Sequence, residues 1–89
     1  MDYQKTSEIL KVIAHPVRLK ILQGFLVNEC NVGGIVKKLD LPQSTVSQHL
    51  SLLRNRGIIM PRKEGVSTCY CVVSQQVRDV LRIFTKQKG

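Results

Sequence analysis

The sequence contains no tryptophan, and aromatic residues make up only 4% of its 89 residues. Proteins that bind single-stranded nucleic acid stack bases on aromatic side chains, so this scarcity disfavours that class. No apolar run approaches the roughly 18 residues of a membrane-spanning helix, and the first residues lack the apolar core of a signal peptide. We therefore expect a single cytoplasmic domain over residues 1–89, with its three cysteines reduced.

Acidic residues are also few, because six Asp and Glu stand against fourteen Lys and Arg, which gives a net charge of +8. The segment from Leu41 to Lys63 contains no acid at all. A domain this basic favours an anionic partner such as nucleic acid. The two histidines have no matched acid and nucleophile, so the sequence carries no catalytic signature and we expect no enzyme.

Residues 42–57 have the pattern of an amphipathic helix. Val46, Leu50 and Leu53 recur at helical spacing and form one apolar stripe. The other positions are mostly short and uncharged, with arginines at the far end, which suits base edges in a DNA major groove and the phosphates beside them. The predicted DNA-binding residues, two of them in the segment that follows, are Gln43, Ser44, Thr45, Ser47, Gln48, Ser51, Arg54, Arg56, Arg62 and Lys63.

Individual roles follow from side-chain chemistry. Gln48 is the predicted reader of an adenine, because its amide can bond that base in a bidentate way. Arg18 could contact a phosphate, or it could pair with Glu8 or Glu29. We expect His49 to pack beside the core and bond a neighbour, in preference to binding DNA or a metal.

Helices are predicted on both sides of this segment. Thr6 or Ser7 is suited to cap a first helix, which ends at His15 because the residue before a proline avoids helical geometry. Pro16 then begins a second helix. A short third helix is predicted over about residues 32–39.

After Gly57 the pattern becomes strand-like. An edge strand from Ile58, a turn at Glu64–Gly65 and a second strand over residues 67–73 form a predicted hairpin. Ser74 is suited to cap a last helix. The predicted fold is mainly α with a small β-hairpin, a winged helix-turn-helix with an extra helix at each end.

Three motifs in this order resemble those of the ArsR/SmtB family of bacterial transcriptional repressors. They are A-H-P-V-R-L-K-I-L at 14–22, Q-S-T-V-S-Q-H-L at 43–50 with the L-R and G-I-I that follow, and Arg62, Gly65 and Tyr70. The resemblance implies a homodimer that binds double-stranded DNA at an inverted repeat and is released by a small inducer. The implied interface belongs to the outer helices and comprises Ile9, Ile13, Val80, Leu81 and Phe84.

The effector does not follow from the resemblance. Members of this family often sense metal ions, but the usual Cys-x-Cys of the third helix is absent here. The last helix offers Asp79 without a histidine, so we expect no metal and no cofactor. Cys69 and Cys71 share one face of a strand and are the candidate effector residues, for a thiol-directed inducer. The favoured alternative is that Cys30, Cys69 and Cys71 are small hydrophobic residues that fill the fold.

Two alternative functions remain open at this point. The same fold can serve as a thiol-based redox or reactive-sulfur sensor, which the cysteines of the second strand would support. A winged helix can also bind RNA or another protein instead of duplex DNA, although this leaves the acid-free polar helix face without a purpose.

Overall fold

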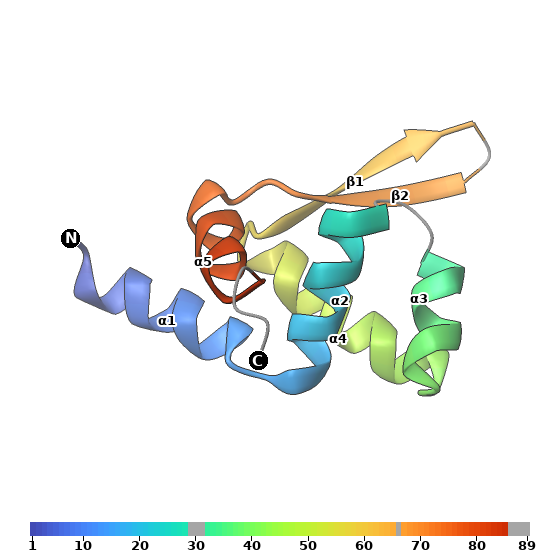
Figure 1. The fold of residues 1–89 in the computed structure, drawn as a ribbon, viewed down its shortest axis with the longest axis horizontal. Helices are drawn as coiled ribbons and strands as arrows, with labels where there is room; N and C mark the ends of the chain where they lie inside the picture. The colour runs from blue at the N-terminus through green and yellow to red at the C-terminus, as the bar shows by residue number, and fades with distance from the viewer. Residues whose placement is uncertain (29–31, 66, 86–89) are drawn as a thin grey trace.

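The computed structural model describes residues 1–28, 32–65 and 67–85 of the chain. Within these ranges, helices and strands follow one another in the predicted order (Figure 1). The helices are α1 (Tyr3–Ile13), α2 (Pro16–Asn28), α3 (Val32–Leu39), α4 (Gln43–Asn55) and α5 (Gln75–Thr85). The strands are β1 (Ile59–Glu64) and β2 (Ser67–Val72). The fold is mainly α with one small hairpin, which confirms the predicted winged helix-turn-helix.

The helix-turn-helix unit consists of α3 and α4, supported by α2. The turn between α3 and α4 passes through Asp40, which has a left-handed φ of 53°. Aspartate tolerates this geometry better than most residues because its short side chain can bond locally. α2 and α3 pack together at Gly24, where a Cβ would lie 3.4 Å from the Ile35 side chain, at the limit of ordinary van der Waals contact.

One apolar core holds the described elements together. Its buried members come from α1, α2, α4, α5, the hairpin and Ile58 just before it, and they include the complete apolar stripe predicted for α4. They are Val12, Ile13, Ile21, Leu22, Phe25, Val46, Leu50, Leu53, Ile58, Ile59, Val72, Val77 and Leu81. Because α4 inserts its stripe into this core, its opposite face is fixed toward solvent.

The helix ends confirm the predicted cap at Ser74, correct the one predicted for α1 and show a further cap at His15. The side chain of His15 accepts a bond from the Val17 N–H at 3.1 Å, and Ser74 accepts one from the Val77 N–H at 3.3 Å. The cap of α1 is Asp2, which accepts from the Lys5 N–H at 3.0 Å. The prediction of Thr6 or Ser7 was wrong, because α1 begins earlier and Ser7 bonds back to a carbonyl of its own helix.

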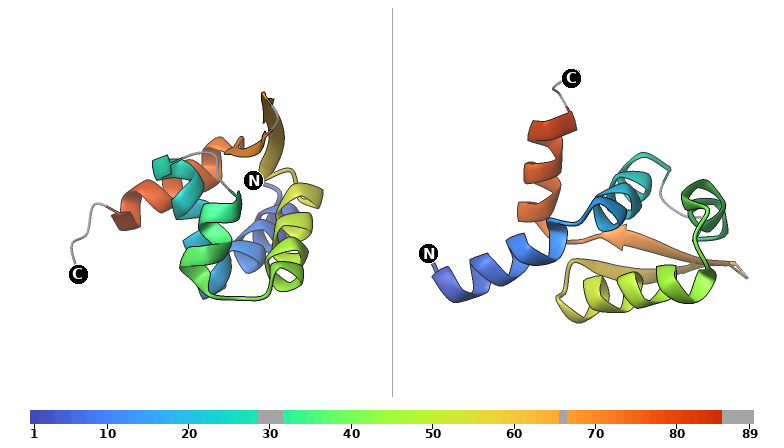
Figure 2. Two further views of the ribbon diagram at one scale, coloured as in Figure 1. Left: turned by 90° about the vertical axis from the view of Figure 1, so that its right-hand side faces the viewer. Right: turned by 90° about the horizontal axis from the view of Figure 1, so that it is seen from below.

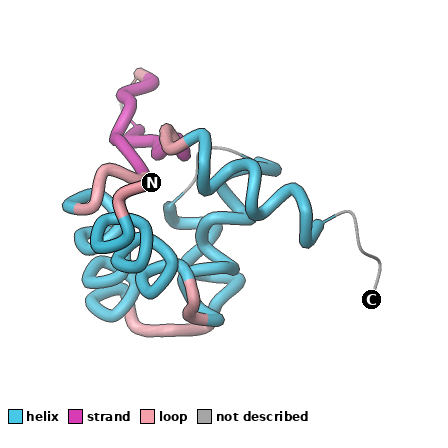
Figure 3. The backbone as a smooth tube through the Cα atoms, turned by 90° about the vertical axis from the view of Figure 1, so that its left-hand side faces the viewer, coloured by secondary structure: helices cyan, strands magenta, loops and turns pink. Residues whose placement is uncertain are grey.

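The hairpin stands out from the helical body (Figure 3). Its strands are antiparallel, with Arg62 opposite Cys69 and Lys63 opposite Thr68. Gly65 takes a left-handed φ of 62° at the tip, as the predicted Glu64–Gly65 turn requires. The hairpin is attached to the core through Ile59 and Val72, so it forms the wing of the fold.

The two outer helices project from the body in different directions (Figure 2). On α1, Leu10 is 48% exposed, and on α5 Phe84 is 65% exposed. None of the described helices is long and apolar enough to cross a lipid bilayer.

Candidate nucleic-acid interface

The helix α4 has the two faces that its sequence predicts. Val46, Leu50 and Leu53 are buried, whereas the side chains on the outer face are exposed. The exposed members of the predicted set on this helix are Gln43, Ser44, Ser47, Gln48, Ser51 and Arg54. Thr45 is only half-buried, because it lies between the outer face and the core. The outer face therefore presents hydroxyl and amide groups without a single negative charge.

The carboxyl end of α4 turns the chain into the wing. Gly57 takes a left-handed φ of 71° and donates to the carbonyl of Arg54 at 2.9 Å, while the Ile58 N–H bonds the carbonyl of Leu53. This closure satisfies carbonyls that the helix end leaves without partners. Arg62 and Lys63 of β1 are exposed on the wing that follows. The predicted DNA-binding residues thus lie on α4, at its carboxyl-terminal cap and on β1.

Leu52 interrupts the polar sequence of α4, and its position has a simple explanation. Its side chain is half-buried and packs against the edge of the core. The apolar stripe is therefore wider than three residues, as is usual for a surface helix of a globular protein. Leu52 belongs to the scaffold and not to the exposed polar face.

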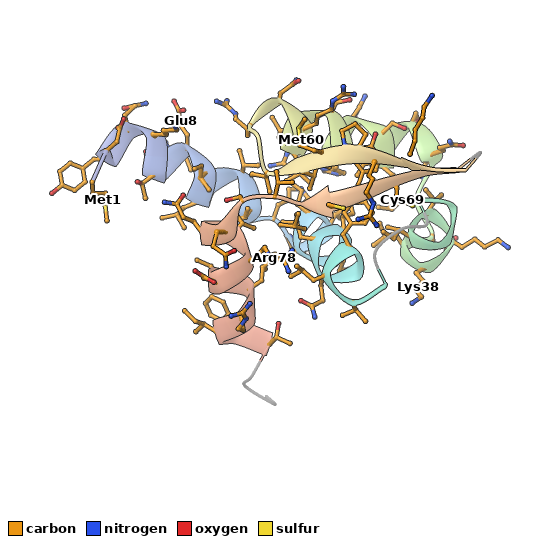
Figure 4. All side chains as sticks on the ribbon, turned by 90° about the horizontal axis from the view of Figure 1, so that it is seen from above. Met1, Glu8, Lys38, Met60, Cys69 and Arg78 are labelled. Carbon is orange, nitrogen blue, oxygen red and sulfur yellow. The ribbon has the colours of Figure 1, made fainter. Side chains whose placement is uncertain are left out.

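Arg56 is held by an acidic residue of another helix. Its Nη1 lies 3.5 Å from Oε2 of Glu8 on α1, and both side chains are nearly half exposed. Figure 4 labels Glu8 on α1. An exposed pair of this kind contributes at most about 1 kcal/mol. The side chain can therefore leave Glu8 for a phosphate at little cost.

Arg18 does not pair with Glu8, and Glu29 lies outside the described residues. Instead its Nε donates to Nδ1 of His49 at 3.2 Å, and its Nη1 donates to the Val12 carbonyl at 3.0 Å. The predicted pair with Glu8 was wrong, because the guanidinium is turned toward α1 and α4, and a phosphate contact of Arg18 stays a prediction. His49 is half-buried and bonded to a neighbour, as the sequence predicts.

The cysteines of β2 differ in their exposure. Cys69 is buried, with 3% of its surface exposed, whereas Cys71 is half-buried. Neither forms a disulfide bond within the described part of the chain, and Cys30 lies outside it. Figure 4 labels Cys69 on the wing. Burial favours a packing role for Cys69, and it leaves Cys71 as the more accessible thiol.

No three His, Cys, Asp or Glu side chains gather closely enough to hold a metal ion in the described part of the chain. The two histidines of the chain, His15 and His49, have ring centroids 4.9 Å apart. Nδ1 of each ring already accepts a hydrogen bond from the protein. The described residues thus do not fit the metal that regulators resembling this chain often sense.

Comparison with known proteins agrees with this geometry. Residues 15–60 match the family described as "Bacterial regulatory protein, arsR family". A helix-turn-helix transcriptional regulator of Methanocaldococcus jannaschii is 37% identical over 91% of this chain and 92% of its own length. The transcriptional repressor PagR of Bacillus anthracis is 34% identical over 93% of this chain and 84% of its own length.

Solved structures show the same fold. HlyU from Vibrio cholerae superposes with a TM-score of 0.86 at 35% identity, covering 97% of this chain and 96% of that protein. The PagR structure gives a TM-score of 0.80 at 34% identity, over 94% and 97% of the two chains. The sequence match, the shared fold and the acid-free helix face agree: the chain belongs to the ArsR family of bacterial regulatory proteins, a family of DNA-binding transcriptional regulators.

Proposed function

We propose that this protein binds a specific duplex DNA sequence as a homodimer and represses transcription from the operon that carries it. The observation that carries the proposal is the exposed face of α4, which has hydrogen-bonding side chains, no acid and a rigid connection to the core. Such a face fits the edges of base pairs in the major groove, which offer donors and acceptors in a sequence-dependent pattern. We propose that the protein acts in the cytoplasm, where operator DNA is accessible.

The contacts divide into base contacts and phosphate contacts. Gln48 lies in the exposed half of α4 and is the proposed adenine reader, with Gln43, Ser44, Thr45, Ser47 and Ser51 beside it. Arg54 and Arg56 at the helix end, and Arg62 and Lys63 on the wing, are the proposed phosphate contacts. Phosphate contacts supply affinity and orientation, whereas base contacts supply specificity.

A homodimer is supported by the apolar surface of α1 and α5, which the described residues leave exposed. A groove of about 1170 Å³ runs between α1, α2, α3 and α5, and Leu10, Val80 and Phe84 line it. Of the five predicted interface residues, Ile13 and Leu81 are buried within the protomer, and Ile9 and Val80 are partly buried. Phe84 is the one that presents most of its surface to a partner. We propose that a second copy covers this face across a twofold axis, which matches an inverted-repeat operator.

Release from DNA by a thiol-directed inducer is the finer part of the proposal. It is supported by Cys71, which is partly accessible, and by the position of both cysteines on the strand that faces Arg62 and Lys63 of the wing. Modification in the middle of β2 would disturb the wing and its phosphate contacts.

Competition binding tests the central proposal. A duplex selected from a random library should bind the wild-type protein at least ~1,000-fold more tightly than its scrambled version at physiological salt. The RNA of the same sequence should bind no better than scrambled DNA, because its deep and narrow major groove excludes a helix. Equal affinity for selected and scrambled duplexes, or preference for the RNA, would overturn the proposed function.

A further inference from the structure

One guanidinium joins three helices of the fold. Arg18 on α2 bonds the carbonyl of Val12 near the end of α1 and the ring of His49 in the middle of α4. The Val12 carbonyl would pair with the N–H of residue 16 if the helix continued, but Pro16 has no N–H. Arg18 therefore supplies a partner to an otherwise unpaired carbonyl, and this bond fixes the guanidinium in front of α4.

The bond between Arg18 and His49 depends on the protonation state of the ring. Nδ1 of His49 accepts from Nε of Arg18, so this nitrogen carries no proton in the structure. A protonated imidazole has an N–H at both nitrogens and accepts no hydrogen bond. Protonation would replace an attractive contact with the repulsion of two positive charges 3.2 Å apart.

The surroundings of His49 keep it neutral near physiological pH. Burial lowers the pKa of His49 below its ordinary value of 6.5, and the charges of Arg18 and His15 lower it further. Arg18 faces it from α2, and His15 faces it from the turn between α1 and α2. The carboxylate of Glu8 on α1 is engaged with Arg56, just beyond the end of α4.

We propose that Arg18 is a positioning residue for DNA recognition, which holds α4 through neutral His49, and that protonation of His49 releases this hold and lowers sequence discrimination. The proposal rests on the proposed DNA-binding function. His49 directly follows Gln48, so a change in the position of His49 moves Gln48, the proposed base reader. The added positive charge also attracts phosphates, so binding to unrelated DNA should not weaken.

The ratio of two affinities measures this effect. Binding to the selected duplex and to its scrambled version is measured from about pH 8 to about pH 5 at constant ionic strength, across the range in which histidine titrates. The ratio should fall roughly tenfold to a hundredfold, which is the factor that one charge-assisted hydrogen bond contributes to an equilibrium. The midpoint of the fall should lie below 6.5, in keeping with the direction of the His49 pKa.

Two matched substitutions separate the histidines. His49→Asn keeps an acceptor near the Nδ1 position and cannot be protonated, so its affinity ratio should stay high at low pH. His15→Asn keeps an acceptor for the Val17 N–H at the start of α2, so the ratio should still fall at low pH, with a midpoint moved upward because the charge of His15 no longer lowers the pKa of His49. A ratio that does not change with pH in the wild type, or that changes equally in His49→Asn, would overturn the proposal.

Nuclear magnetic resonance of the wild-type protein gives an independent readout if His49→Asn does not fold. The midpoint of the His49 ring titration should coincide with the midpoint of the affinity ratio, and different midpoints would overturn the proposal. A wild-type protein that shows no discrimination even near pH 8 would instead refute the DNA-binding function, and the role of Arg18 with it. The two failures are therefore distinguishable.

Discussion

The substitution Phe84→Glu is the most severe test of the proposed homodimer. A phenylalanine side chain buries roughly 150–250 Å² when it is fully covered. Since 65% of Phe84 is exposed in the protomer, a partner can cover roughly 100–160 Å² of it, which is worth about 2.5–4 kcal/mol at ~25 cal/mol/Å². Twofold symmetry doubles this contribution, so the dimer dissociation constant should rise at least a thousandfold.

Sedimentation velocity over a range of micromolar concentrations measures the change. The wild type should sediment as a dimer and Phe84→Glu as a monomer, with the helical circular dichroism of the protomer retained because the side chain is exposed. Gln75→Glu, at the exposed start of the same helix, is the control for added charge on α5 and should remain a dimer. A monomeric wild type, or a dimeric Phe84→Glu, would refute the assigned interface.

Three further predictions concern the wing and the histidine network. Arg62→Ala should weaken binding to all DNA sequences alike and reduce the slope of log affinity against log salt by about 0.9, whereas Arg82→Ala on α5 should leave the slope unchanged. The Cys69→Ser, Cys71→Ser double variant should stay on DNA when peroxide, persulfide or arsenite is added. If these compounds released the variant as readily as the wild type, both cysteines would have only a packing role. Because folding lowers the pKa of His49, stability should fall as the pH drops below 6.5 toward the folded-state pKa. Thermal melts should show this fall in the wild type and a smaller one in His49→Asn.

The fold could be predicted largely because its local signals agree with one another. The apolar stripe of α4, the proline that begins α2 and the Glu64–Gly65 turn each determine a local conformation, and the core uses all of them. The start of α1 was missed because Thr6 and Asp2 are both good caps. Only the observed bond from Lys5 to Asp2 distinguishes them.

The polar contacts between elements could not be predicted in this way. Arg18 and His49 are 31 positions apart, and Arg56 and Glu8 are 48 apart, so no periodicity connects them. Sequence patterns identify which face of a helix is buried, but they do not determine which charged side chain reaches across. Arg18 was therefore expected at a phosphate or an acid, whereas a carbonyl left unpaired by Pro16 turns it inward. That carbonyl is the sequence signal that could have located it.

The most direct test of DNA recognition by α4 is the base preference of Gln48→Ala at each position of the selected duplex. Loss of the amide should cost ~1–3 kcal/mol at one base pair and relax the preference there, while the preference at the other positions is kept. Gln75→Ala, which removes a glutamine whose side chain bonds Asp79 within α5, should leave every position unchanged. If Gln48→Ala bound all sequence variants with the wild-type pattern, α4 would not be the helix that reads the DNA.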